Sequence, residues 1–102
     1  MDELVRFLRE RLTEDVERAR TIGNMLVTSS GAGSNIPAEA AERQARSQVY
    51  VAAVRQTLFE ETIRPYLGTA GPTGRIAEQQ IRLFAAMYAE HRDYRTEWAP
   101  EA

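Results

Sequence analysis

Two clusters of helix-breaking residues divide this chain of 102 residues into three segments. The clusters run from Thr28 to Pro37 and from Gly68 to Gly74, and both are rich in glycine together with serine, threonine or proline. Such clusters are typical of loops between regular elements. Since no segment alternates apolar and polar residues as a half-buried strand does, we expect an all-α fold. The predicted helices cover residues 2–27, 38–64 and 74–98, and the predicted loops cover residues 28–37 and 65–73, all within a single domain, 1–102.

The first and third predicted helices each carry one apolar stripe. At about 100° per residue, the stripe of the first helix comprises Leu4, Val5, Leu8, Leu12, Val16, Ala19, Ile22 and Leu26. The stripe of the third helix comprises Ile76, Leu83, Phe84 and Met87. An amphipathic helix buries such a stripe against a neighbour. We therefore expect the first two helices to form a long antiparallel hairpin, with the third helix packed across it.

The second predicted helix has apolar residues on two sides. One stripe comprises Ala38, Ala41, Ala45, Val49, Ala52, Phe59 and Ile63. The other, almost opposite, comprises Ala40, Val51, Val54 and Leu58. Helices of this length, about 35–42 Å, would also extend beyond a compact monomer whose radius of gyration is about 13 Å. Both observations predict a homo-oligomer, with a dimer favoured, unless a helix bends or ends early.

The C-terminal segment from Tyr88 to Pro100 contains the only histidine, the only tryptophan and two of the four tyrosines. If the third helix continues to Trp98, then Met87, His91, Tyr94 and Trp98 extend its apolar stripe. Aromatic rings that carry polar atoms suit both core packing and a binding surface. We predict a structural latch with an exposed edge at Glu90, Arg92 and Arg95. The candidate partner patch comprises Tyr88, Glu90, His91, Arg92, Tyr94, Arg95 and Trp98.

Asp15 lies in the middle of the apolar stripe of the first helix, and Arg11 lies one turn earlier. A carboxylate on a buried face must be paired or protonated. We therefore expect a structural ion pair of Asp15 with Arg11 or with an arginine of another helix. The alternative is a small-molecule or metal-binding enzyme that uses Asp15, His91 and Asp93, which requires these side chains to converge on one cavity.

Other catalytic arrangements find little support in the sequence. Carboxylate metal sites in helical bundles use Glu-x-x-His, whereas Glu90 and His91 are adjacent and point about 100° apart on a helix. A single histidine in the chain disfavours a serine-histidine triad. We predict no catalytic residue, no metal and no cofactor, and the sequence favours a non-enzymatic protein.

Charge and composition limit the partners. Thirteen basic residues, all arginine, against fifteen acidic residues give a formal charge of −2, with both signs mixed along the chain. Phosphate binding needs a positive surface, so this charge balance disfavours nucleic acid as a partner. A DNA-binding regulator is therefore only the third hypothesis for the function. The acidic start does not resemble a signal peptide, and no apolar run approaches the roughly 20 residues of a membrane span. We expect a cytoplasmic interaction protein that binds itself or another protein and no membrane.

Two motifs resemble a known family. Residues 4–15 read Leu-Val-Arg-Phe-Leu-Arg-Glu-Arg-Leu-Thr-Glu-Asp, and residues 88–98 read Tyr-Ala-Glu-His-Arg-Asp-Tyr-Arg-Thr-Glu-Trp. They are similar to the two ends of a domain-of-unknown-function family of small actinobacterial and actinophage proteins, with patterns LVxFLxxRLxED and YAxHxDYRxEW. Arg92 replaces the family's usual proline, and the Gly-Pro-Trp and His-Asp-Pro of other members are missing. The resemblance implies an actinobacterial or phage source, links Asp15 with the C-terminal motif, and implies no reaction.

Overall fold

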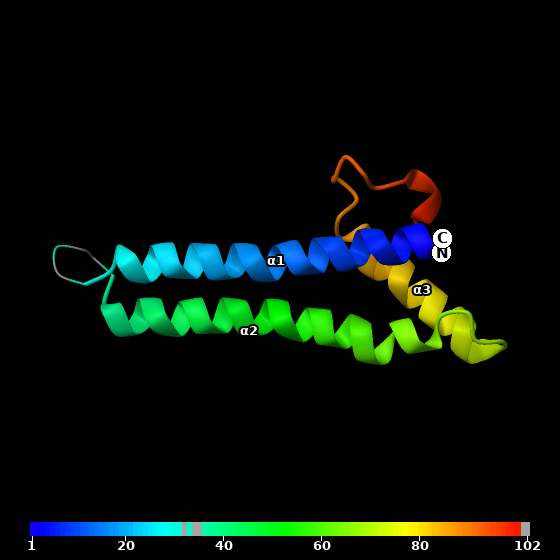
Figure 1. The fold of residues 1–102 in the computed structure, drawn as a ribbon, viewed down its shortest axis with the longest axis horizontal. Helices are drawn as coiled ribbons and strands as arrows, with labels where there is room; N and C mark the ends of the chain where they lie inside the picture. The colour runs from blue at the N-terminus through cyan, green and yellow to red at the C-terminus, as the bar shows by residue number, and fades with distance from the viewer. Residues whose placement is uncertain (32, 34–35, 101–102) are drawn as a thin grey trace. The chain divides into compact units, whose positions relative to one another are not determined.

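The computed structural model of the chain describes residues 1–31, 33 and 36–100. Over these residues it contains α1 (Asp2–Thr28), α2 (Ala38–Thr62) and α3 (Pro72–Ala86), with two short 3-10 helices, η1 (Arg64–Tyr66) and η2 (Thr96–Trp98) (Figure 1). The described residues include no strand. The all-α class predicted from the sequence is therefore confirmed.

Proline and glycine set the boundaries of the helices where the sequence predicted breaks. α2 ends at Thr62, and Pro65 lies in the 3-10 turn that follows, because proline lacks the N–H that an α-helix interior needs. α3 begins at Pro72, immediately after Gly71, whose φ of 80° is accessible to glycine at little cost. The predicted loop at 28–37 lies partly outside the described residues.

The chain forms two compact units, each of which takes part of α1 and part of α2. The three-helix unit consists of residues 1–11 and the described residues from 56 onward, so it contains the start of α1, the end of α2 and all of α3. The two-helix unit consists of residues 12–55 and contains the remaining parts of α1 and α2. The expectation that residues 1–102 form a single helical domain stays a prediction.

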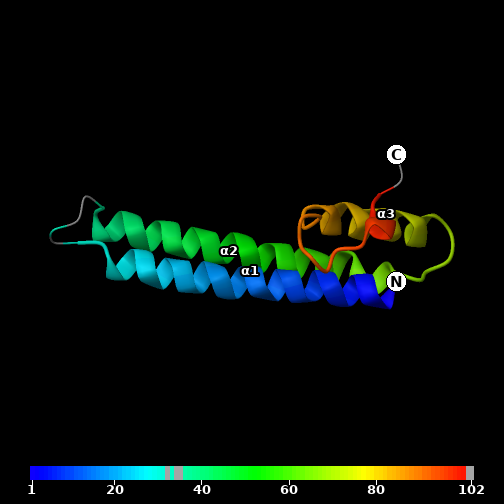
Figure 2. The same cartoon turned by 90° about the horizontal axis from the view of Figure 1, so that it is seen from above.

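In the three-helix unit, α3 lies across the end of α2 and the start of α1 (Figures 1 and 2). The rings of Phe59 and Phe84 meet edge to face with centroids 6.5 Å apart. A Cβ at Gly74 would lie 1.7 Å from the carbonyl oxygen of Thr69, so only glycine lets the first turn of α3 pass this loop. The buried apolar residues of the unit are Leu4, Phe7, Leu8, Phe59, Ile63, Ala77, Ile81, Phe84, Ala85 and Trp98.

The third helix is shorter than the predicted 74–98, and of its predicted apolar stripe only Phe84 is buried. After Ala86 the backbone changes to bonds between each N–H and the carbonyl three residues earlier, as in Met87 to Phe84 and Tyr88 to Ala85. These tight turns end the α-helix, so the stripe predicted to continue through Met87, His91, Tyr94 and Trp98 does not form. Ile76, Leu83 and Met87 are each more than half exposed, because the packed face is built from Gly74, Ala77, Ile81, Phe84 and Ala85.

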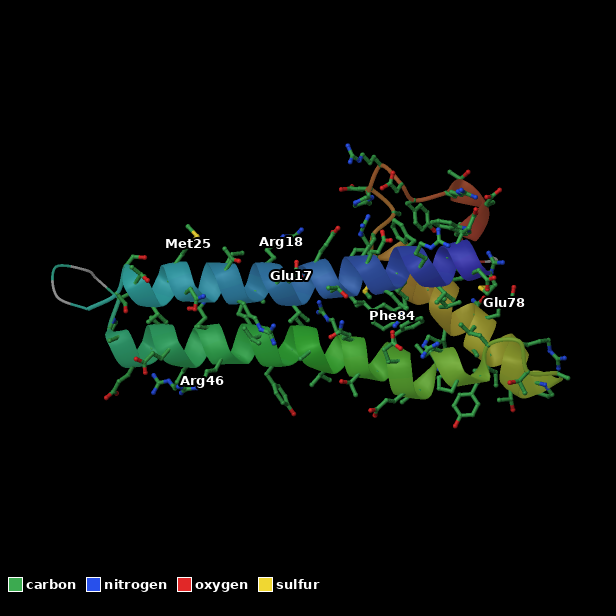
Figure 3. All side chains as sticks on the ribbon, in the orientation of Figure 1. Glu17, Arg18, Met25, Arg46, Glu78 and Phe84 are labelled. Atoms are coloured by element: carbon green, nitrogen blue, oxygen red, sulfur yellow. The ribbon has the colours of Figure 1, made fainter. Side chains whose placement is uncertain are left out.

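In the two-helix unit, the parts of α1 and α2 run antiparallel (Figures 1 and 2). Small residues let the two helices approach closely: a Cβ placed on Gly23 would lie only 3.0 Å from the Cβ of Ala45. The buried residues are Leu12, Val16, Gly23, Ala41 and Ala52. Met25 and Arg18 point away from α2, and Arg46 points away from α1 (Figure 3). Ile22, predicted to lie in the buried stripe, is more than half exposed.

None of the helices in the described part of the chain has the length and apolar content needed to cross a membrane.

Candidate functional site

The C-terminal segment packs against Phe7, which lies on α1 in the three-helix unit. The Phe7 ring is buried, with centroids 5.5 Å from His91, 5.9 Å from Tyr94 and 5.2 Å from Trp98. The rings of Tyr94 and Trp98 also meet edge to face at 5.7 Å. Edge-to-face pairs at these distances are favourable, because the positive ring edge meets the negative ring face. We call Phe7, His91, Tyr94 and Trp98 the aromatic cluster.

Arg11, one turn after Phe7 on α1, joins this cluster to the polar groups of the tail. Its residue surface is only 6% exposed, and its guanidinium carbon lies 5.1 Å from the centre of the Phe7 ring. Arg11 Nη1 lies 3.0 Å from His91 Nδ1 and 2.5 Å from Nε2, so the guanidinium donates to the imidazole. It also lies 4.0 Å from Oδ2 of Asp93. The cluster therefore combines ring packing, a cation–π contact and hydrogen bonds.

His91 also fixes the turn in which it lies. The backbone N–H of Asp93 donates to His91 Nδ1 at 3.1 Å, and the Asp93 carboxylate lies 3.9 Å from the same nitrogen. A neutral imidazole has one acceptor nitrogen, so in the tautomer protonated at Nε2 the Nδ1 atom accepts from both Arg11 Nη1, at 3.0 Å, and the Asp93 N–H. This arrangement orients the ring, as a structural histidine requires, and occupies its nitrogens with groups of the protein itself.

The end of the tail is attached to both α1 and α3. Arg95 forms ion pairs with Glu3 and, at 3.6 Å, with Glu97, and its guanidinium carbon lies 5.4 Å from the centre of the Trp98 ring. On the other side, Arg82 of α3 donates to the carbonyl oxygen of Glu97 at 3.1 Å. Trp98 is left only 9% exposed. The tail is therefore packed as part of the three-helix unit.

The seven residues of the predicted partner patch occupy different environments. Glu90, Arg92 and Arg95 are exposed, whereas Trp98 is buried and Tyr88, His91 and Tyr94 are half-buried. A polar groove of about 450 Å³ runs beside the cluster. It is lined by Glu3, Arg6, Phe7, Glu10, Arg92, Asp93, Tyr94, Arg95 and Trp98.

Asp15 lies in the two-helix unit, apart from the unit that holds His91 and Asp93. Its carboxylate accepts a hydrogen bond from Arg18 at 3.2 Å. The Arg11–Asp15 ion pair and the convergence of Asp15 with His91 and Asp93 stay predictions. Within residues 1–31, 33 and 36–100, no group of three or more histidine, aspartate and glutamate side chains is placed to hold a metal ion.

The two-helix unit has a groove on each side of its helix pair. The first, about 460 Å³, is lined by Asp15, Arg18, Ala19, Ile22, Ser47, Gln48, Val51, Ala52 and Arg55, and we call it the mixed groove. The second, about 560 Å³, is lined by Arg20, Gly23, Asn24, Val27, Ala45, Arg46, Val49, Tyr50 and Ala53, and we call it the apolar groove.

Neither the role of Phe7 nor the apolar groove was predicted from the sequence. Phe7 and Arg11 are four residues apart, which places them on one face of α1, and both lie inside the first family-like motif. That spacing could have indicated that both side chains contact the same segment of the chain. The apolar groove has a weaker signal, because Gly23 and the alanines that form its floor carry little hydrophobicity of their own.

Comparison with known proteins gives one positive result. Neither the curated proteins nor the solved structures contain a match to this chain. A model of a family of unknown function, DUF6221, matches residues 1–100. That range includes both motifs and all residues of the aromatic cluster. The chain therefore belongs to the DUF6221 family of unknown function.

Proposed function

We propose that this protein is an interaction protein that associates with a second copy of itself through the mixed groove of its two-helix unit. The observation that carries the proposal is the exposure of apolar side chains, since Ile22 and Val51 line this groove and Met25 and Val54 lie one turn further along the same helices. Val51 and Val54, from the second stripe of α2, are 45% and 46% exposed. Ile22 and Met25 of α1 are more than half exposed. Two helices alone leave these residues in water, and a second hairpin placed against them would form a four-helix bundle.

The size of this face agrees with a dimer interface. Residues 38–55 of α2, at about 1.5 Å per residue, span roughly 27 Å, and two neighbouring helices are roughly 20 Å wide. The flat area of this face is therefore about 500 Å². Its accessible area is larger, because the side chains make the surface uneven. It is then comparable to the roughly 800 Å² that each partner buries in a standard interface.

The charges around the mixed groove are compatible with a two-fold interface. Asp15 lies there with Arg18 and Arg55, so the groove carries both signs. In a two-fold dimer the same surface meets itself, and a surface with both signs can then pair its own charges. Asp15 of one copy can face an arginine of the other copy without leaving like charges together.

The proposal is tested by placing a charge in the groove. Light scattering coupled to gel filtration should give a dimer for the wild-type protein and a monomer for the double variant Ile22→Glu/Val51→Glu, because a buried carboxylate without a partner is costly. Ile76→Glu, at an equally exposed apolar residue of α3, is the matched control and should remain dimeric. A wild-type monomer at high micromolar concentration would refute the proposal, and so would a double variant that stays dimeric.

The wider role that we propose follows the same reasoning. A self-associating helical protein with mixed surface charge acts by binding protein, in the cytoplasm of an actinobacterium or of a cell infected by its phage. Fractionation of the native host, with an antibody against the protein, would test this location.

A further inference from the structure

The apolar groove lies on the two-helix unit and has a small-residue floor with larger side chains beside it. The small residues Gly23, Ala45 and Ala53 line the groove together with the larger Val27, Val49 and Tyr50. Tyr50 is 70% exposed although it is a large aromatic residue. Exposed tyrosine next to an apolar depression is typical of residues that contribute strongly to protein interfaces.

The charged side chains that line this groove are all of one sign. Arg20 comes from α1 and Arg46 from α2, and both are exposed. Within the described part of the chain, neither arginine forms an ion pair. This differs from the mixed groove, where an aspartate accompanies the arginines.

The charges decide between the possible occupants. A second copy bound at this groove by two-fold symmetry would bring four unpaired arginines together, which is unfavourable. An acidic partner instead gives each guanidinium a carboxylate, with which arginine forms bidentate hydrogen bonds. We therefore propose that the apolar groove binds an amphipathic helix of another protein, whose apolar face enters the groove and whose acidic flanks meet Arg20 and Arg46.

This mode of binding has a defined pattern. A helix that lies in a groove presents apolar residues at positions i, i+3 or i+4, and i+7. Its glutamates or aspartates would lie on the two sides of that stripe, because Arg20 and Arg46 belong to different helices. The mixed groove and the apolar groove share no residue, so this inference does not depend on the proposed self-association.

The test uses a designed probe, a fluorescein-labelled helical peptide of about 18 residues, or five turns, with a leucine stripe flanked by glutamates. A second peptide has lysine in place of every glutamate. Fluorescence anisotropy should show that the full-length protein binds the glutamate peptide, and that it binds the lysine peptide at least about tenfold more weakly, since each charge-assisted hydrogen bond contributes substantially.

Two variants make the test specific. Arg20→Glu/Arg46→Glu should reverse the preference, so that the lysine peptide binds better, and Tyr50→Ala should weaken binding of both peptides. Arg43→Glu and Tyr66→Ala are the matched controls at exposed residues outside the groove and should leave both affinities unchanged. Circular dichroism checks that each variant keeps its helix content. In NMR spectra, the glutamate peptide should shift the amide signals of Gly23, Ala45 and Ala53.

Several results would overturn the inference. These are absence of binding, equal binding of the two peptides, an unchanged preference in the charge-reversed variant, and shifted amide signals that map outside the groove. A further contrary result is a loss of dimer mass in Tyr50→Ala while the peptide fails to bind, because a second copy would then occupy the apolar groove.

Discussion

Trp98→Ala should destabilise the protein strongly, because the C-terminal tail is packed through this ring. A large aromatic side chain buries about 150–250 Å², which corresponds to roughly 4 to 6 kcal/mol at about 25 cal/mol per Å². Trp98 is only 9% exposed, so nearly all of this contribution applies. Its contacts with Phe7, Tyr94 and Arg95 would be lost as well.

The net decrease in the free energy of unfolding should be smaller than the full contribution of this burial and these contacts, for a reason specific to this position. Trp98 lies in the short 3-10 helix η2, which can detach as a segment and so need not leave a cavity. Each backbone residue that is released regains about 1–2 kcal/mol of conformational entropy, which offsets part of the lost burial. We expect a decrease of roughly 2 to 4 kcal/mol in the free energy of unfolding, at the lower part of the range for large-to-small aromatic substitutions.

The assay is urea unfolding followed by far-ultraviolet circular dichroism, since the variant lacks the only tryptophan. Thermal unfolding should agree, with a decrease of roughly 4 to 8 °C in Tm for each kcal/mol. Tyr66→Ala, at an aromatic residue that is 47% exposed, is the control and should change stability by less than about 0.5 kcal/mol. A loss below about 1 kcal/mol for Trp98→Ala would refute the packed position of the ring.

Three further substitutions test other contacts by the same unfolding assay. Arg11→Ala should lower the free energy of unfolding by about 2 kcal/mol, as expected for the hydrogen bonds of a charged group. The control Arg6→Ala, at an exposed residue, should lower it by less than about 0.5 kcal/mol. Equal effects of the two substitutions would contradict the role of Arg11. Gly74→Ala should destabilise by about 1–3 kcal/mol despite the higher helix propensity of alanine, because its Cβ would meet the Thr69 carbonyl, and a stabilised variant would contradict this contact. Gly23→Val should cost a similar amount, roughly 1–3 kcal/mol, by separating α1 from Ala45, and a neutral effect would show that the helices are farther apart.

The sequence was sufficient to predict features that depend on neighbours along the chain. Proline and glycine act on their own backbone, so the breaks after Thr62 and before Pro72 follow from local chemistry. The regular spacing of Leu4, Leu8 and Leu12 likewise identified the buried face of α1, and all three are buried.

The end of the third helix could not be predicted from neighbouring residues in the sequence. The spacing of His91, Tyr94 and Trp98 fits a helix, but the tail instead turns after Ala86 and packs against Phe7. That contact joins residues more than 80 positions apart, and a single sequence contains no periodic signal for such a pair. The buried face of α3 was predicted only at Phe84, because Gly74 and Ala77 are buried through their small size and Ile81 lies outside the predicted stripe.

The candidate site was predicted in part by composition alone. The concentration of aromatic and charged residues from Tyr88 to Trp98 does mark a structured segment, and its side chains contact α1 and α3. The sequence did not show which of them are buried, since that depends on Phe7 and Arg11. The second stripe of α2 was easier to recognise, because Val51, Val54 and Leu58 recur at spacings of three and four residues, and all three are exposed.

The most direct test of self-association through the two-helix unit is the mass of the wild-type protein in solution. Sedimentation equilibrium across micromolar concentrations should give a mass approaching twice the 11.5 kDa of one chain, and Val51→Glu should lower it toward that of one chain. A wild-type mass that stays at that of a single chain throughout the concentration range would contradict the proposed function.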